Sequence, residues 1–144
     1  MRIAQVVPLW EHLPLTNHRS AEYSISLLTD ELVRRGHDVT LFAAAGSDSL
    51  AWLEPGCDQP LAEAKVRLQE YLLHEQIQLS RVFNCPGRFD LIHVQGSLAA
   101  LPYGQLSKTP VLHSLYEPLS ALLAQPPKAL NSSKMASLTG SNFD

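Results

Sequence analysis

The first 45 residues contain a predicted strand, helix and second strand in close succession, and this pattern constrains the fold more than any other feature. The apolar run 2–7 ends at Pro8, which is typical of a buried strand stopped by a proline. Ser20 is a suitable N-cap for the helix that follows, and Gly36 is well placed to end that helix in a left-handed turn. Strand residues follow at 39–43. Because two strands joined by a helix normally lie parallel, this opening predicts a parallel sheet.

Two helices predicted in the first half of the chain are amphipathic. In the helix that begins after Ser20, apolar side chains recur at helical spacing at Ala21, Ile25, Leu28 and Leu32. Residues 61–83 are expected to form one longer helix, whose apolar side is made by Leu61, Ala64, Leu68, Leu72 and Ile77. Because an apolar stripe on a helix normally faces the core, these side chains are the expected contacts with the sheet.

The remaining segments continue the alternation of helices and strands. Residues 44–60 are rich in glycine and proline and are expected to form a loop. Further strands are expected at 89–94, 110–114 and 135–139, and short helices at 97–106 and 117–123. The order of elements predicts an α/β protein with an open, doubly wound and mostly parallel sheet.

Composition excludes several classes of function. The chain of 144 residues has the length of one domain, and its hydrophobic content of 45% is ordinary for a globular protein. A net charge of −3 without basic clusters argues against nucleic acid. No apolar run is long enough for a membrane span or a signal peptide, so a soluble cytoplasmic protein is expected. Cys57 and Cys85 are too isolated to indicate a metal site.

Four stretches, taken in their order along the chain, resemble a known family. Residues 1–45 have the strand–helix–strand opening, and 88–94 contain a strand of the type F-D-[VL]-I-H. Residues 101–112 and 137–143 are similar to the two strand regions that follow in that family. The set resembles the N-terminal, acceptor-side domain of GT-B glycosyltransferases of the family 4 type. The resemblance implies a Rossmann-like half-domain that transfers a sugar from a nucleotide-sugar to a hydroxyl acceptor, with no obligatory metal and no other cofactor.

The loop between the first strand and the first helix departs from this family. The family has glycines there, which let the backbone approach the donor diphosphate, whereas residues 13–20 contain none. Arg19 and the helix start at Ser20 are candidates for attracting an anion, although a solvated arginine beside a helix cap is the simpler interpretation. Glu22 matches the family's acidic residue in the first turn, and a carboxylate favoured by the helix dipole explains it equally well.

The ends of the third and fourth strands supply the remaining site candidates. His93 matches the first histidine of the family's I-H-x-H strand end, and Gln95 stands at the second. Tyr116 stands where the family often has a histidine pointing into the cleft. His113 is expected on the opposite strand face and is no substitute. Tyr116 and His93 are therefore the catalytic candidates by resemblance, and histidines hydrogen-bonded within the sheet are an equally good interpretation of His93 and His113.

The resemblance covers only one half of a GT-B enzyme. In the family a C-terminal domain holds the nucleotide-sugar, so the single domain 1–144 is expected to be incomplete at its C-terminal end and inactive alone. A separate donor domain would then dock at a cleft edge that is expected to be apolar and is formed by residues 8–20, 95–98 and 114–118. A homodimer is also expected as a possibility, because an uncovered face of a parallel sheet invites association. The alternative is a non-catalytic binding or interaction module that kept the fold and lost the site. A dinucleotide-binding domain is disfavoured because G-x-G-x-x-G is absent.

Overall fold

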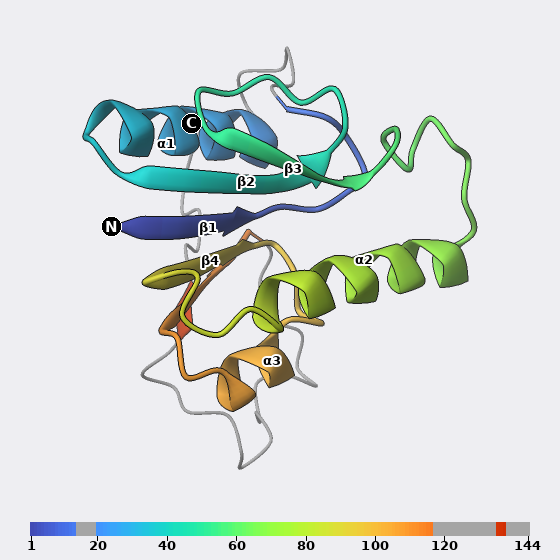
Figure 1. Cartoon of the computed structure of the whole chain (residues 1–144). Coiled ribbons are helices and arrows are strands. Elements are labelled where there is room, and N and C mark those ends of the chain that lie inside the picture. The colour runs from blue at the N-terminus through green and yellow to red at the C-terminus, as the bar shows by residue number, and fades with distance from the viewer. Residues whose placement is uncertain (14–19, 117–134, 138–144) are drawn as a thin grey trace.

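A parallel sheet forms the centre of the molecule, as the sequence predicted, and it has six strands where five were expected. The structure, a computed structural model, describes residues 1–13 and 20–116 and the backbone of 135–137. Its strands lie in the order β3-β2-β1-β4-β5-β6, and every neighbouring pair is parallel (Figure 1). The strands are β1 (Arg2–Val6), β2 (Asp38–Ala44), β3 (Trp52–Cys57), β4 (Leu91–Gln95), β5 (Val111–Leu115) and β6 (Met135–Ser137).

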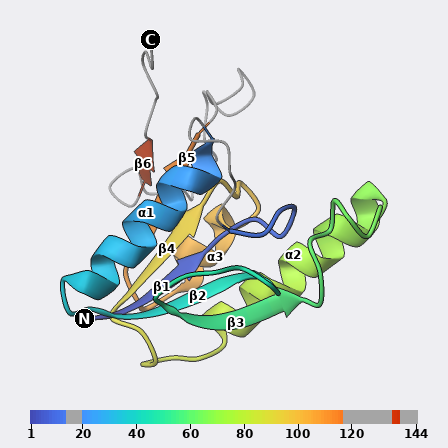
Figure 2. The ribbon, with the colours of Figure 1, turned by 90° about the horizontal axis from the view of Figure 1, so that it is seen from above.

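Helices cover both faces of the sheet, which makes it doubly wound. Helix α1 (Ala21–Arg34) packs on one face, where Ile25 meets Leu41 of β2 and Val7. Helices α2 (Leu68–Phe83) and α3 (Leu101–Leu106) pack on the other face, around Phe42 and Val94 (Figure 2). The predicted fold class is therefore confirmed: an α/β protein with a Rossmann-like sheet.

Helix α1 begins and ends where the sequence predicted, but part of its predicted buried face is wrong. The Ser20 hydroxyl accepts a hydrogen bond from the backbone N–H of Tyr23 at 3.2 Å. Gly36, at a φ of +85°, donates its N–H to the Val33 carbonyl at 2.9 Å. Leu28 is exposed, however, while Thr29 is buried. The Thr29 hydroxyl donates to the Ile25 carbonyl at 2.7 Å, so its burial leaves no polar group unpaired.

The loop expected at 44–60 is wrong, because its second half forms β3. Among the described strands β3 pairs only with β2, so Pro55 lies on an edge strand where a missing N–H is tolerated. Gly56 lets α2 approach closely. A Cβ at this position would lie 2.3 Å from Gln78 Oε1 and 2.7 Å from Leu9 Cδ2.

The second predicted helix is shorter than expected, and its apolar side is wrong. Helix α2 begins at Leu68 rather than at residue 61, and its buried side chains are Gln78, Leu79 and Val82. Leu68, Leu72 and Ile77, which were expected to be buried, are exposed. The N-terminal half of α2 extends past the carboxyl ends of β1 and β2, so no sheet lies beneath it (Figure 1).

Three smaller predictions near the C-terminal half have mixed outcomes. The helix predicted at 97–106 begins only at Leu101. The strand predicted at 135–139 is present as β6 over Met135–Ser137. The helix predicted at 117–123 lies outside the described residues.

Candidate functional site

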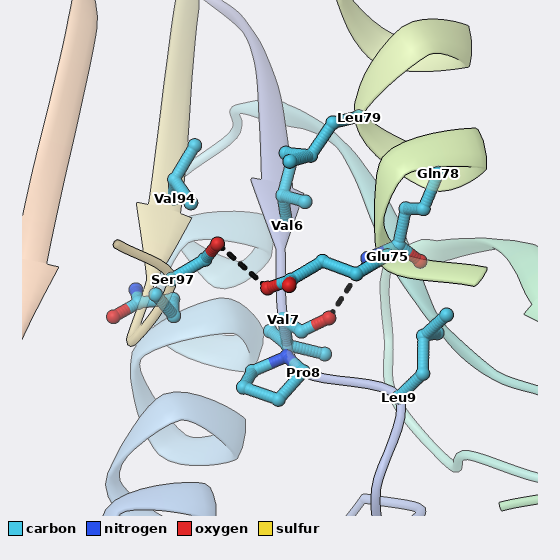
Figure 3. Close-up of a pocket in the computed structure, with 10 residues that line it drawn as sticks. Val6, Val7, Pro8, Leu9, Glu75, Gln78, Leu79, Val94 and Ser97 are labelled. Atoms are coloured by element: carbon cyan, nitrogen blue, oxygen red, sulfur yellow. Dashed lines mark hydrogen bonds between the residues drawn. The ribbon is translucent and has the colours of Figure 1, made fainter. Parts of the chain in front are cut away.

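The topology places the candidate site at the carboxyl ends of β1 and β4. From β1 the chain crosses to β2 over one face of the sheet, and later reaches β4 on the other side of β1. The strand order reverses between these two strands, and open α/β sheets bind ligands in the crevice outside such a reversal. The residues lining this crevice come from the two strand ends, the segment after β1, and helix α2 (Figure 3).

The crevice is nearly filled by the protein's own side chains. Ser97 donates its hydroxyl to Glu75 Oε1 at 2.7 Å, which joins the segment after β4 to α2. Gln78 Nε2 donates to the Val7 carbonyl at 2.9 Å, which joins α2 to the end of β1 (Figure 3). The remaining cavity has a volume of about 10 Å³. That is the space of a single water molecule.

A buried network of amide and hydroxyl groups lies beside this crevice, on the α1 side of the sheet. Gln95 Nε2 donates to Gln5 Oε1 at 3.1 Å and contacts His93 Nδ1 at 3.2 Å. Tyr116 Oη donates to Gln95 Oε1 at 2.6 Å. His93 Nε2 lies 2.7 Å from Ser114 Oγ. Each partner comes from β1, β4, β5 or the residue after β5, so the network ties together the strand ends that border the crevice.

The network fixes the protonation state of His93. Burial, together with the nearby charge of His113, lowers the pKa of His93 to about 4. The imidazole is therefore neutral near pH 7. Because Gln95 Nε2 can only donate, Nδ1 of His93 must accept, and the ring proton sits on Nε2, where it donates to Ser114. With both nitrogens used inside the sheet, His93 fits the interpretation as a structural histidine.

His113 lies on the opposite face of the sheet, as predicted. It pairs in register with Val94, and burial lowers the pKa of its imidazole. Its Nδ1 is buried without a hydrogen-bond partner among the described residues. A Cβ at Gly104 would lie 2.7 Å from His113 Nε2, so the glycine in α3 makes room for this ring.

The predicted rim residues meet at one edge of the sheet. Burial, and then the carboxylate of Glu22, raises the pKa of the Tyr116 phenol, so this group stays protonated and acts as a donor. The Tyr116 ring also packs against the apolar cluster to which Ile25 of α1 belongs. Gly96, at a φ of +73°, lies between Tyr116 and Pro8: a Cβ at this position would be 3.6 Å from the proline ring and 3.9 Å from the tyrosine ring.

The structure therefore brings together most of the sequence-predicted site. Gln95 and Tyr116 are in direct contact, with His93 behind them and Glu22 close by, while Ser20 caps α1 at the same edge. Arg19 lies outside the described residues.

Sequence reasoning missed Glu75 and Gln78, which line the crevice from α2. Their helix was predicted, but nothing in the local pattern indicates which side of it reaches the end of β1.

Metal and membrane features are absent from the part of the chain that the structure describes. No group of three potential metal ligands occurs in residues 1–13 and 20–116. None of the helices in these ranges is long and apolar enough to cross a membrane.

Comparison with known proteins adds no family assignment. No protein-family model matches the sequence, and no curated protein matches it. The fold defines the class of protein, a Rossmann-like α/β domain with polar residues at its topological switch point. The likeness to GT-B enzymes rests on the motifs alone.

Proposed function

We propose that this chain is the acceptor-side half of a GT-B type glycosyltransferase and acts with a second domain that holds the nucleotide-sugar. The observation that carries the proposal is the hydrogen bond from Tyr116 to Gln95 beside the switch point of the sheet, with the carboxylate of Glu22 close enough to raise the pKa of the Tyr116 phenol. Those three positions were expected at the acceptor site from the motifs. The strand order, with its reversal between β1 and β4, also supports it, because that arrangement places ligands at this edge.

The chemistry of this edge suits a hydroxyl-bearing acceptor. The Tyr116 oxygen donates its proton to Gln95 and keeps lone pairs that can accept from a sugar hydroxyl. Glu22 supplies a carboxylate, which accepts hydrogen bonds only. Neither residues 20–24 nor 95–98 contain lysine or arginine. Arg19, which lies outside the described residues, is the one arginine directly beside these segments in the sequence, so we expect most of the positive groups that stabilise a leaving diphosphate to come from the second domain.

A non-catalytic binding module is the second candidate function. The observation that favours it is the closure of the site: the crevice has about 10 Å³ of space, and Gln95 is fully buried within its own network. A scaffold that had lost its ligand would retain such a network for stability. This candidate predicts no affinity for nucleotide-sugars or their sugars.

The experiment that separates the two is ligand-observed NMR on the purified chain. A panel of monosaccharides and disaccharides as hydroxyl acceptors, with UDP, GDP and their sugars alongside, is titrated into protein whose folding is verified by circular dichroism. The proposal expects saturable binding of a sugar-bearing ligand that weakens about tenfold in Tyr116→Ala. Tyr103→Phe, which removes a hydroxyl bonded to Gln76 away from the switch point, is the matched control. A folded chain that binds none of these compounds would support the non-catalytic module.

A further inference from the structure

Helix α2 carries its apolar stripe beyond the sheet that the stripe should cover. Leu79 is 1% exposed beneath the helix. Leu72 and Leu68 lie seven and eleven residues earlier, at helical spacing that places them on the same side as Leu79. They are nevertheless 44% and 72% exposed, because this half of α2 projects past the strand ends (Figures 1 and 2). The stripe has the spacing of a buried helix face, but no other described element covers Leu68 and Leu72.

The segment that precedes α2 is hydrogen-bonded to the segment that follows β1, and Tyr71 of α2 also contacts that segment. Leu61 and Ala62 donate their N–H groups to the carbonyls of Leu9 and Trp10 at 2.9 and 3.0 Å. The Trp10 ring packs edge-on against Tyr71 of α2, with ring centres 5.8 Å apart. Trp10 is still 47% exposed. Residues 8–13 and 58–77, which we call the α2 shelf, therefore present Trp10, Leu68 and Leu72 on an ordered surface.

The α2 shelf is also acidic. Residues 8–13 and 58–77 contain five carboxylates and two cationic side chains, and so carry a net charge of −3. This equals the formal net charge of the whole chain. One of the two cations, Arg67, is paired with Glu70 at 3.3 Å. An open groove of about 310 Å³ borders the shelf and is lined in part by Asp58, Glu63 and His12. A lysine or arginine side chain would find two carboxylates in that groove.

We propose that the α2 shelf is a docking surface for a protein partner that presents a basic amphipathic helix. Exposed leucines four residues apart on a helix fit the apolar face of a second helix. The surrounding carboxylates select a partner with lysine or arginine at its rim, because opposite charges speed encounter and exclude wrong partners. The same negative charge disfavours nucleic acid and anionic membranes as occupants. This inference is independent of the proposed transferase function, and the apolar side chains on which it rests, Trp10, Leu68 and Leu72, do not line the crevice.

The test uses a synthetic helical peptide of leucine and lysine, labelled with fluorescein, and fluorescence anisotropy with the full chain. A peptide with the same leucines and with glutamate in place of lysine is the charge control. We expect saturable binding of the lysine peptide, weakened by added salt, and no binding of the glutamate peptide. The double variant Leu68→Gln, Leu72→Gln should weaken binding about tenfold. Both leucines are exposed, so these variants should fold.

Two controls make the result specific to the shelf. Leu106→Gln removes a leucine of α3 that is 85% exposed, and it should bind the lysine peptide like the wild type. Asp58→Lys should weaken binding of the same peptide, whereas Asp38→Lys at the start of β2, at the opposite end of the strands, should not. Equal binding of both peptides, or equal loss in the Leu106 variant, would overturn the proposal. Self-association that disappears in the Leu68, Leu72 variant would also overturn it, by assigning the surface to a second copy of the chain.

Discussion

Tyr116 Oη donates to Gln95 Oε1 across 2.6 Å and thereby joins the end of β5 to the end of β4. The acceptor belongs to a side chain with no exposed surface, so water cannot replace the tyrosine hydroxyl without entering the sheet. The hydrogen bond thus links two predicted site residues and contributes to the stability of the strand ends.

The first prediction concerns this hydrogen bond. Tyr116→Phe should lower the free energy of unfolding by about 1–2 kcal/mol, because it leaves a buried amide oxygen without its donor. Urea unfolding followed by circular dichroism measures the change. Tyr103→Phe is the comparison, since its partner Gln76 is only half-buried and regains water when the hydroxyl is removed. Equal losses in both variants would contradict the assigned role of Gln95.

The second prediction concerns pH. Burial lowers the pKa of His93 to about 4 in the folded protein, below its ordinary value of 6.5. The unfolded state therefore binds a proton first as the pH falls. The free energy of unfolding, as far as it depends on His93, is therefore highest above pH 6.5. It decreases by at most about 3 kcal/mol as the pH falls from 6.5 toward 4. Below pH 4 the decrease levels off, because the folded state is then protonated as well.

Urea midpoints measured between these pH values test this expectation. His93→Gln removes the titrating group and should flatten the curve, leaving the smaller dependence that His113 adds in the same direction. The control variant is His37→Gln. His37 is half-buried and directly precedes β2. A curve in His93→Gln as steep as that of the wild type would rule out the buried neutral state of His93.

The elements that could be predicted from sequence are those with local signals. Ser20 and Gly36 mark the two ends of α1 because capping depends on residues next to the helix termini. The start of α2 carries a weaker signal: its N-cap position is Arg67, which is no preferred capping residue, although the Glu70 carboxylate accepts from the Arg67 backbone N–H. Strand β3 was missed because glycine and proline indicate a loop unless the strand is known to lie at the edge of a sheet.

The candidate site was predictable in position but not in contacts. Gln95 and Tyr116 follow directly from two strand ends, and parallel strands bring their carboxyl ends to one edge. Their hydrogen bond depends on the register that sets Gln95 beside Ser114, which no local pattern encodes. Glu75 reaches the crevice only because α2 crosses beneath β1, which is a property of packing rather than of sequence spacing.

The third prediction concerns Gly56 in β3. Gly56→Ala should lower the free energy of unfolding by about 1–3 kcal/mol, because its methyl group would collide with the Gln78 amide and Leu9. Thermal unfolding measures the loss. In a Gln78→Ala background, Gly56→Ala should lower the free energy of unfolding by a smaller amount, since one of the two colliding groups is gone. Additive costs in the double variant would show that Gln78 and Gly56 do not pack together.

The last prediction concerns the ion pair that joins the starts of β1 and β4. Asp90 accepts from the Arg2 guanidinium at 2.7 Å and from the Arg2 backbone N–H at 2.7 Å. These hydrogen bonds, the guanidinium first, lower the pKa of Asp90 to about 2, below its ordinary 3.8. The carboxylate's contribution to stability is therefore present above pH 3.8 and is lost as the pH falls toward 2.

Asp90→Asn should lower the melting temperature near pH 7. The difference in melting temperature between this variant and the wild type should become smaller as the pH approaches 2. The effect near pH 7 should be smaller than that of Tyr116→Phe, because both charged groups are about half exposed and solvent screens their attraction. Asp38→Asn, a carboxylate at the start of β2, is the matched control and should leave the melting temperature nearly unchanged. A gap between Asp90→Asn and the wild type that stays constant from neutral to acid pH would show that the carboxylate does not titrate with the low pKa that Arg2 gives it.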